Sequence, residues 1–199
     1  MTSATLASSS LIFPATGQWT VVSGTGTFVD ATDPNTVVNG LSLGANVFQW
    51  TVSNGPCANG ITTDQVTITL FDASTPAADA GPDQELCGEG ALAEMAASPV
   101  IAPGVGTWTL VAGEAVIVDA NDPTTAIQAL GIGENIFVWT VDNGSCGAGL
   151  STATVSIFVF DANNPVADAG PDQELCTPDT DAQLAGSTYA FPAAGTWSV

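Results

Sequence analysis

Short segments in which apolar and polar residues alternate make up most of this chain. The clearest lie at 106–112, 134–142 and 151–161, and Gly, Pro, Asn or Asp residues stand between them. Alternation with a period of two places successive side chains on opposite faces of a strand. Shorter segments of the same kind occupy 115–120 and 124–130. Because no stretch shows the period of about 3.6 residues typical of an amphipathic helix, the pattern predicts an all-β chain.

Two of the predicted strands indicate which side faces a core. Every second residue from Phe137 to Val141, and again from Val155 to Val159, is large and apolar. The intervening turns carry Asp-Pro and Asn-Gly pairs, which favour the backbone angles of tight turns. About seven short strands in fewer than a hundred residues predict an immunoglobulin-like antiparallel β-sandwich.

The same pattern returns after 89 residues without an insertion. Trp19, Trp108 and Trp197 are spaced in this way, and PAADAGPDQELC at 76–87 returns as PVADAGPDQELC at 165–176. A fixed period of this length indicates one independent domain per repeat. We therefore expect tandem sandwiches in a linear array. We also expect the chain to be a segment of a longer polypeptide. The predicted units are a first repeat at 1–75 that lacks its opening segment, a complete second repeat at 76–164, and the opening strands of a third repeat at 165–199.

Four recurring tryptophans are predicted to be core aromatics. Strand alternation places Trp50 and Trp139 beside apolar partners, and Trp19 and Trp108 recur in phase with them. The alternative is that these rings form an exposed platform on which sugar rings stack.

The composition excludes most catalytic chemistry. The chain has no Lys, Arg or His and 20 Asp plus Glu, so its formal net charge is −20. It therefore lacks an imidazole base, a Schiff-base lysine and an arginine that could bind phosphate. Nucleic acid is excluded as a partner because like charges repel and no cationic side chain can release counterions. We expect no enzyme, although a pair of carboxylates alone could still hydrolyse glycosides.

Acidic residues recur in the Pro- and Gly-containing segments that join the repeats, and calcium is their natural partner. Calcium accepts six to eight oxygen ligands with flexible geometry, including backbone carbonyls. A structural calcium ion there would fix the angle between repeats, and no other cofactor is expected. The alternative is that the same carboxylates cap turns and keep the chain soluble. The candidate ligands are Asp72, Asp79, Asp83, Glu85, Asp161, Asp168, Asp172 and Glu174.

A second acidic pattern, DAxDP, occurs at 30–34 and 119–123 in nearly the same form. An aspartate ahead of a proline favours an Asx turn, in which the carboxylate accepts a hydrogen bond from the backbone two residues later. We predict that these aspartates cap turns.

The cysteines also recur in phase. Cys57 and Cys146 are equivalent, as are Cys87 and Cys176. The spacing is unlike that of a metal site, and paired cysteines indicate an oxidising compartment. We predict a disulfide between Cys87 and Cys146, with a bond between Cys57 and Cys87 as the alternative, and an extracellular location.

Several motifs together resemble a known class of repeats. ADAGPDQELC, followed by GTWT, DATDPNT, NVFQWTVSNGPC and DQVTITLFDA, is similar to the PKD-like, immunoglobulin-like repeats of giant cell-surface adhesins from gliding, Bacteroidetes-type bacteria. The resemblance implies export by type IX secretion, a role in gliding motility, and a stalk that presents binding modules located elsewhere. The chain departs from ordinary PKD domains at 50–55, where WTVSNG replaces a WDFGDG-type motif.

These observations favour the structural repeat region of an extracellular adhesin stalk or cell-surface filament. Its expected partners are neighbouring repeats of the same polypeptide and other copies in a filament. We expect no membrane insertion of residues 1–199. The alternative is a sandwich module that binds polysaccharide or another surface. One variant follows from the repeat phase: residues 168–199 carry the segment that the first repeat lacks, so one chain could donate a strand to the next.

Overall fold

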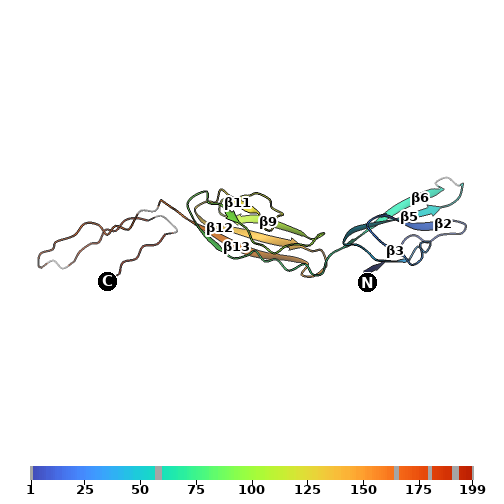
Figure 1. Ribbon diagram of the computed structural model, residues 1–199, viewed down its shortest axis with the longest axis horizontal. Coiled ribbons are helices and arrows are strands. Elements are labelled where there is room, and N and C mark those ends of the chain that lie inside the picture. The colour runs from blue at the N-terminus through green and yellow to red at the C-terminus, as the bar shows by residue number, and fades with distance from the viewer. Residues whose placement is uncertain (1, 57–59, 164–165, 179–180, 190–192, 199) are drawn as a thin grey trace. The chain divides into compact units, whose positions relative to one another are not determined.

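The described part of the chain is built from strands. The computed structural model describes residues 2–56, 60–163, 166–178, 181–189 and 193–198, and Figure 1 shows its strands as arrows. All regular elements in these ranges are β-strands. Among the described residues, no helix is long and apolar enough to cross a membrane. The expected all-β class is confirmed.

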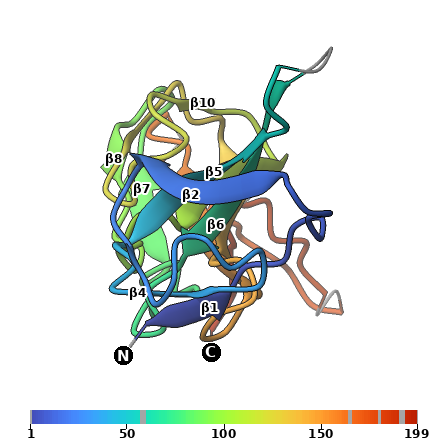
Figure 2. The ribbon, with the colours of Figure 1, turned by 90° about the vertical axis from the view of Figure 1, so that its right-hand side faces the viewer.

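The first repeat forms two sheets that enclose a core. One sheet has the order β2-β5-β6 and the other the order β1-β4-β3, and Figure 2 shows them as two layers. Aromatic and aliphatic side chains from both sheets meet between the layers, with Leu6, Val38 and Phe48 almost fully buried. The strands are β1 (Ser3–Thr5), β2 (Thr16–Ser23), β3 (Thr27–Phe28), β4 (Val37–Asn39), β5 (Gly44–Ser53) and β6 (Ile61–Leu70).

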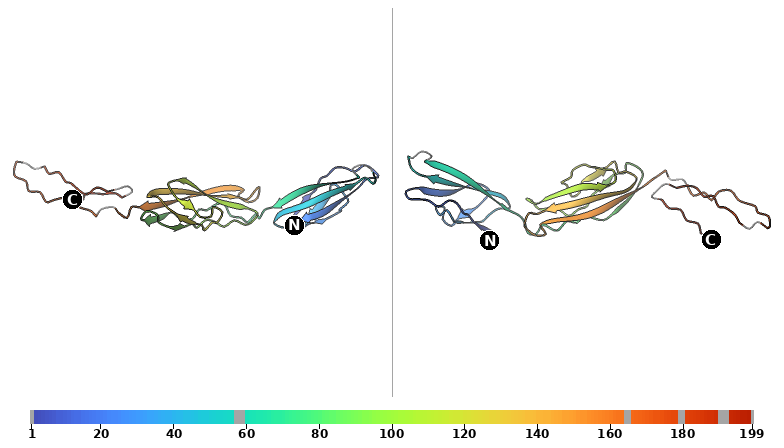
Figure 3. Two further views of the ribbon diagram at one scale, coloured as in Figure 1. Left: turned by 90° about the horizontal axis from the view of Figure 1, so that it is seen from above. Right: turned by 180° about the vertical axis from the view of Figure 1, so that it is seen from behind.

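The second repeat has the same plan with one additional strand. Its larger sheet has the order β7-β13-β12-β9 and its smaller sheet the order β10-β11-β8, and the long strands are seen side by side in Figure 3. The additional strand β7 pairs with β13 in parallel, which the prediction of an antiparallel sandwich did not include. The strands are β7 (Gln84–Cys87), β8 (Ala93–Glu94), β9 (Val105–Ala112), β10 (Val116–Ile117), β11 (Ala126–Gln128), β12 (Gly133–Asp142) and β13 (Leu150–Phe160).

The long strands agree with the pattern of the sequence and the short ones do not. The predicted segments at 115–120 and 124–130 shrink to β10 and β11, because hydrogen-bonded turns begin at Asp119 and Asp122. Strands β7 and β8 were not expected. In particular, Gln84–Cys87 lies in a segment that its Pro and Gly content marked as a connector, yet these residues belong to the sheet of the second repeat.

The described chain divides into two compact units that do not coincide with the repeats. The first unit holds residues 1–77 together with segments 99–105 and 141–151 of the second repeat. The second unit holds the remainder, from Ala78 onward. Two segments of the second repeat, each a loop with the strand ends that adjoin it, therefore pack in the same unit as the first repeat.

A buried asparagine side chain holds the end of sheet β2-β5-β6 and of sheet β7-β13-β12-β9. In the second repeat, Asn135 is 1% exposed. Its Nδ2 donates to the carbonyls of Gly131, Gly133 and Ile157 at 2.9–3.3 Å, and its Oδ1 accepts from the amide of Glu114 at 3.0 Å. Asn46 does the same in the first repeat, with Oδ1 accepting from Thr25 and Nδ2 donating to three carbonyls. In a chain without cationic side chains, neutral amides supply these donors.

We predict that Asn135→Ala destabilises the second repeat by about 2–4 kcal/mol, because three carbonyls and an amide lose a buried partner. Native-state hydrogen exchange of the amides in β12 measures the effect, since these amides report the unfolding of their own repeat. Gln128→Ala, at an exposed position of β11, is the control and is expected to change stability by less than about 0.5 kcal/mol. Equal effects of the two substitutions would contradict the assigned role of Asn135.

Candidate functional site

The acidic residue that follows β6 caps a turn. The Asp72 carboxylate accepts hydrogen bonds from the Ser74 hydroxyl at 2.7 Å and from the Ser74 amide at 2.8 Å. These two bonds hold the pKa of Asp72 below its ordinary value, because they stabilise the charged form. The side chain of Asp72 is therefore ionised and already engaged within its own turn.

Most of the other predicted calcium ligands make similar bonds. Asp79 and Asp168 each accept from the amide of a glycine two residues later, and Asp161 accepts from the amide of Asn163. Asp83 accepts from the amide of Ser156 on β13 at 2.8 Å.

Among the described residues, no three His, Cys, Asp or Glu side chains come together in a way that could hold a metal ion. Inter-repeat calcium stays a prediction. Of the remaining candidates, Glu85 lies opposite Phe158 in the ladder of β7 and β13, while Asp172 and Glu174 lie in the exposed segment after Val166.

The aspartates of the two DAxDP motifs cap turns as predicted. Asp30 accepts from the amide and the hydroxyl of Thr32, and Asp122 does the same with Thr124. These bonds lower the pKa of both carboxyls. Asp33 and Asp119 also accept from the amide two residues later.

The predicted disulfide between Cys87 and Cys146 is wrong for this structure. Both are free thiols, as is Cys176, while Cys57 lies outside the described residues. The physical reason is the direction of β7. Cys87 pairs with Phe160 at the last residue of β13, whereas Cys146 precedes the first residue of that strand. About ten residues of extended strand separate the two positions, or roughly 33 Å, and a disulfide requires Cα atoms within about 7 Å.

The four tryptophans are buried in pairs. The ring centroids of Trp19 and Trp50 are 5.1 Å apart, and those of Trp108 and Trp139 are 5.0 Å apart, with interplanar angles of 43° and 42°. All four side chains are at most 4% exposed. Their faces are therefore covered by protein atoms and do not form a platform for sugar rings.

One long-range contact was missed in the sequence: the side chain of Asn143 bonds to the turn after β6. Asn143 Nδ2 donates to the carbonyl of Asp72 at 2.8 Å and to that of Cys146 at 3.3 Å. Thr75 donates its amide to the same Asp72 carbonyl. Both side chains are buried, and among the described residues Asn143 Oδ1 and Thr75 Oγ1 have no hydrogen-bond partner. The contact therefore joins loop 141–151 to turn 72–75 within the first compact unit.

The backbone beside Asn143 fits this contact closely. Gly144 has a φ of +58°, and a Cβ atom there would lie 2.7 Å from the ring of Phe71. Glycine is the residue that adopts this angle and leaves this space. The sequence did contain a signal, because Asn-Gly recurs at 54–55 and 143–144 and Phe-Asp recurs at 71–72 and 160–161. Nothing in the sequence shows, however, that these two pairs meet.

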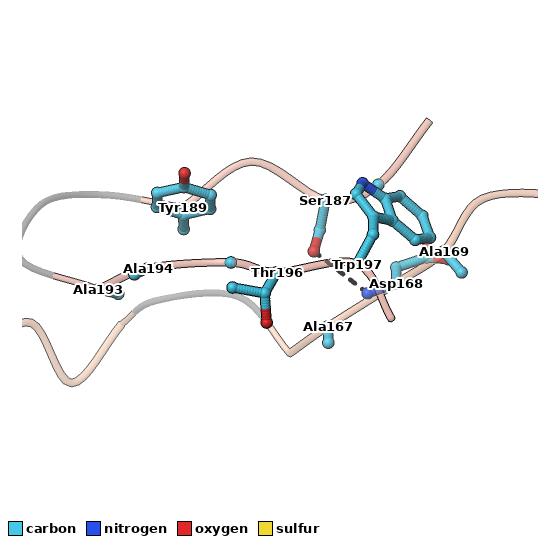
Figure 4. Close-up of a pocket in the computed structure, with 11 residues that line it drawn as sticks. Ala167, Asp168, Ala169, Ser187, Tyr189, Ala193, Ala194, Thr196 and Trp197 are labelled. Atoms are coloured by element: carbon cyan, nitrogen blue, oxygen red, sulfur yellow. Dashed lines mark hydrogen bonds between the residues drawn. The ribbon is translucent and has the colours of Figure 1, made fainter. Parts of the chain in front are cut away.

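A hollow in the third repeat is lined mainly by small residues and by two aromatic rings. Figure 4 shows Tyr189 and Trp197 at its wall, with the Asp168 amide donating to the Ser187 hydroxyl. Trp197 is 59% exposed, whereas its equivalent in the second repeat, Trp108, is 2% exposed. The tryptophan that is buried in the second repeat is therefore exposed at this hollow in the third.

We predict that Asn143→Ala speeds the exchange of the amides of Thr75, Cys146 and Gly149 by about tenfold, the effect of losing one buried hydrogen bond. Hydrogen exchange resolved by residue measures this change. The matched control is Asn54→Ala, the equivalent exposed position in the first repeat, which is expected to leave these three amides unchanged. If Asn143→Ala also leaves them unchanged, the contact does not hold the loop.

Comparison with known proteins gives matches among solved structures. No family model matches the sequence, and no curated protein matches it. Three solved structures illustrate the similarity. A PKD domain from the KIAA 1837 protein has 23% identity and a TM-score of 0.39, covering 47% of this chain and 94% of that one. Fibronectin(III)-like modules of CbhA from Clostridium thermocellum have 14% identity and a TM-score of 0.35, covering 74% and 78%. The human Desmocollin-1 ectodomain has 14% identity and a TM-score of 0.31, covering 81% and 36%.

Proposed function

We propose that this chain is a structural repeat region of an extracellular adhesin stalk or cell-surface filament. In this role, sandwiches arranged in line connect and present binding modules that lie elsewhere. Cell adhesion, surface location, type IX secretion and gliding motility belong to this proposal, and they come from the resemblance of the repeat motifs. The chain's own chemistry is compatible with it, because its side chains offer neither a base of the imidazole type nor any cation.

One observation carries the proposal: the same sandwich is built twice on the same buried positions. Trp19, Phe48 and Trp50 in the first repeat correspond to Trp108, Phe137 and Trp139 in the second. The buried Asn46 and Asn135 correspond in the same way. Asp64 and Ala153, which differ between the repeats, are exposed and half-buried respectively, and the buried positions that differ stay apolar, as with Val38 and Ile127. Sequence identity between the repeats is therefore concentrated at positions that maintain the fold. This is expected for a module whose repetition serves to lengthen a stalk.

The contact of Asn143 with the Asp72 carbonyl supports the same role. A stalk that transmits force needs contacts between one repeat and the next. Loop 141–151 of the second repeat and the turn after β6 share one compact unit, and a buried side chain bonds across them. Both Asn-Gly and Phe-Asp recur with the period of the repeats, so the same contact is available at every joint of a longer array.

We predict that small-angle X-ray scattering of the chain gives an elongated particle. A compact protein of this length has a radius of gyration of roughly 16 Å. Sandwiches in line must give a distinctly larger radius, and the scattering curve must still be that of folded domains. The measurement is made with calcium and again with excess chelator. If calcium fixes the joints, the particle becomes more flexible on chelation; if proline and the Asn143 contact suffice, the curves coincide. A radius near the compact value in both conditions would contradict the stalk.

A further inference from the structure

The two cysteines of the second repeat lie at its opposite ends. Cys87 is the last residue of β7 and lies opposite Phe160, the last residue of β13. Cys146 lies in the loop between β12 and β13, ahead of the first residue of β13. The length of β13 separates the two positions, so each cysteine adjoins a different neighbouring segment of the chain.

A Phe-Asp-Ala sequence recurs where the last strand of each repeat ends, at 71–73 after β6 and at 160–162 at the end of β13. In the second repeat, the chain that leaves β7 flanks this segment. The Gly88 amide donates to the Phe160 carbonyl at 2.8 Å. A Cβ atom on Gly88 would lie 3.8 Å from the Cβ atom of Ala162. The end of β7 is therefore held against the Phe-Asp-Ala segment of its own repeat.

The side chain of Cys87 leaves the sheet on the same face as the ring of Phe160. The two residues are a register pair in a parallel ladder, and the side chains of such a pair lie on one side of the sheet. This is the outer face. Val159 is buried in the core, and the Phe160 ring contacts the ring of Phe158, two residues earlier, with centroids 5.4 Å apart.

The loop that carries Cys146 covers the equivalent place on the first repeat. Leu70 packs against the core of the first repeat, so strand alternation points Phe71, the next residue, to the outer face. The loop meets Phe71 there, because a Cβ atom on Gly144 would lie 2.7 Å from its ring. Both segments belong to the first compact unit.

Cys146 is held close to the same segment from two sides. Asn143 Nδ2 donates to the Cys146 carbonyl and also to the Asp72 carbonyl. After the cysteine, a Cβ atom on Gly147 would lie 3.3 Å from the carbonyl oxygen of Ala73. Cys146 therefore lies between residues that contact the Phe-Asp-Ala segment of the preceding repeat.

We propose that Cys87 of one repeat and Cys146 of the next form a disulfide across the joint between them. Both positions flank the Phe-Asp-Ala segment, one from its own repeat and the other from the loop of the following repeat. The inference rests on the proposed array, in which the contact of Asn143 recurs at every joint. It gives the recurring cysteines a role that sandwiches in line do not by themselves require.

The positions are within the reach of a disulfide. One strand spacing, about 4.8 Å, separates Cys87 from Phe160. Cys146 follows Gly144 by two residues, which span at most roughly 7 Å. A disulfide requires Cα atoms within about 7 Å, and within one repeat the two cysteines are several times farther apart than that. The joint therefore brings together two positions that the repeat itself keeps apart.

The oxidation requires an electron acceptor, which a small-molecule disulfide supplies. One cysteine thiolate attacks a sulfur of that disulfide and releases one small thiol. The second cysteine then attacks the mixed disulfide, forms the bond across the joint and releases the other small thiol. Two protein thiols are oxidised and one small disulfide is reduced to two thiols. An extracellular location is an oxidising compartment in which such a bond persists.

The bond would give each joint a covalent link besides the main chain. The hydrogen bond of Asn143 to the Asp72 carbonyl can open under load, whereas a disulfide keeps the loop docked while it is intact. The stiffness of the array would then depend on the redox conditions around it.

The test uses the full chain with residues 76–164 duplicated in tandem, which keeps the period of the repeats and creates a joint between two identical copies. All cysteines but two are changed to serine. In the joint variant the two are Cys87 of the first copy and Cys146 of the second. In the matched control they are Cys87 and Cys146 of the first copy.

Each protein is equilibrated at low concentration with reduced and oxidised glutathione. Titration of the remaining thiols and mass spectrometry of linked peptides measure the disulfide. We expect its equilibrium constant against glutathione to be larger by about tenfold or more in the joint variant than in the control. All variants should retain slow hydrogen exchange in β12 of both copies, since Cys87 is exposed and Cys146 half-buried.

Asn143→Ala in the second copy provides the second arm. It loosens the loop that carries the cysteine of the joint, so the equilibrium constant of the joint variant should fall severalfold. Asn143→Ala in the first copy is the control, because that residue belongs to the preceding joint, and it should leave the constant unchanged.

Three results would overturn the proposal. The joint variant could keep both thiols reduced, or the control with both cysteines in one copy could oxidise as readily. A joint disulfide that ignores Asn143→Ala in the second copy would also contradict it, because the bond would then form by chance encounter and not in the docked loop. None of these results bears on the stalk itself, whose elongation scattering measures separately.

Discussion

The pairing of Gln84–Cys87 with Ile157–Phe160 is the contact on which the completed sandwich depends. A strand at the edge of a sheet exposes unpaired amides and carbonyls and leaves its apolar face open to water. In the second repeat, β7 removes both problems, and Val155, Ile157 and Val159 of β13 are almost fully buried. In the first repeat nothing described pairs with that edge of β6, and no residue of the strand is fully buried.

The absence of cationic side chains explains how the polar groups of this protein are satisfied. No ion pair between side chains can form, so the charged carboxylates are stabilised by hydrogen bonds from amides and hydroxyls of their own turns, as with Asp72 and Asp122. Deeper in the fold, neutral asparagines replace charged donors. Asn46 and Asn135 bind backbone groups at the ends of sheets β2-β5-β6 and β7-β13-β12-β9, and Asn143 does so between loop 141–151 and the turn after β6.

The sequence predicted the long strands and the repeat because both depend on local alternation and on identity at a fixed spacing. It missed β7 because Pro82 and Gly81, which normally mark a connector, directly precede residues that pair only through a distant strand. The disulfide was wrong for the same reason, since parallel pairing places Cys87 at the far end of β13 from Cys146. The contact of Asn143 with Asp72 joins residues 71 positions apart, and neither residue carries a local signal of that partner.

Hydrogen exchange of two equivalent amides tests most directly whether the segment at 78–87 closes the sandwich. The Ser156 amide points to the covered edge and donates to Asp83, and Thr67 is its equivalent on the open edge of β6. The account predicts slow exchange at Ser156 and exchange faster by about tenfold or more at Thr67. Equal protection of the two amides would contradict it, because the edge of β6 would then be as well covered as that of β13.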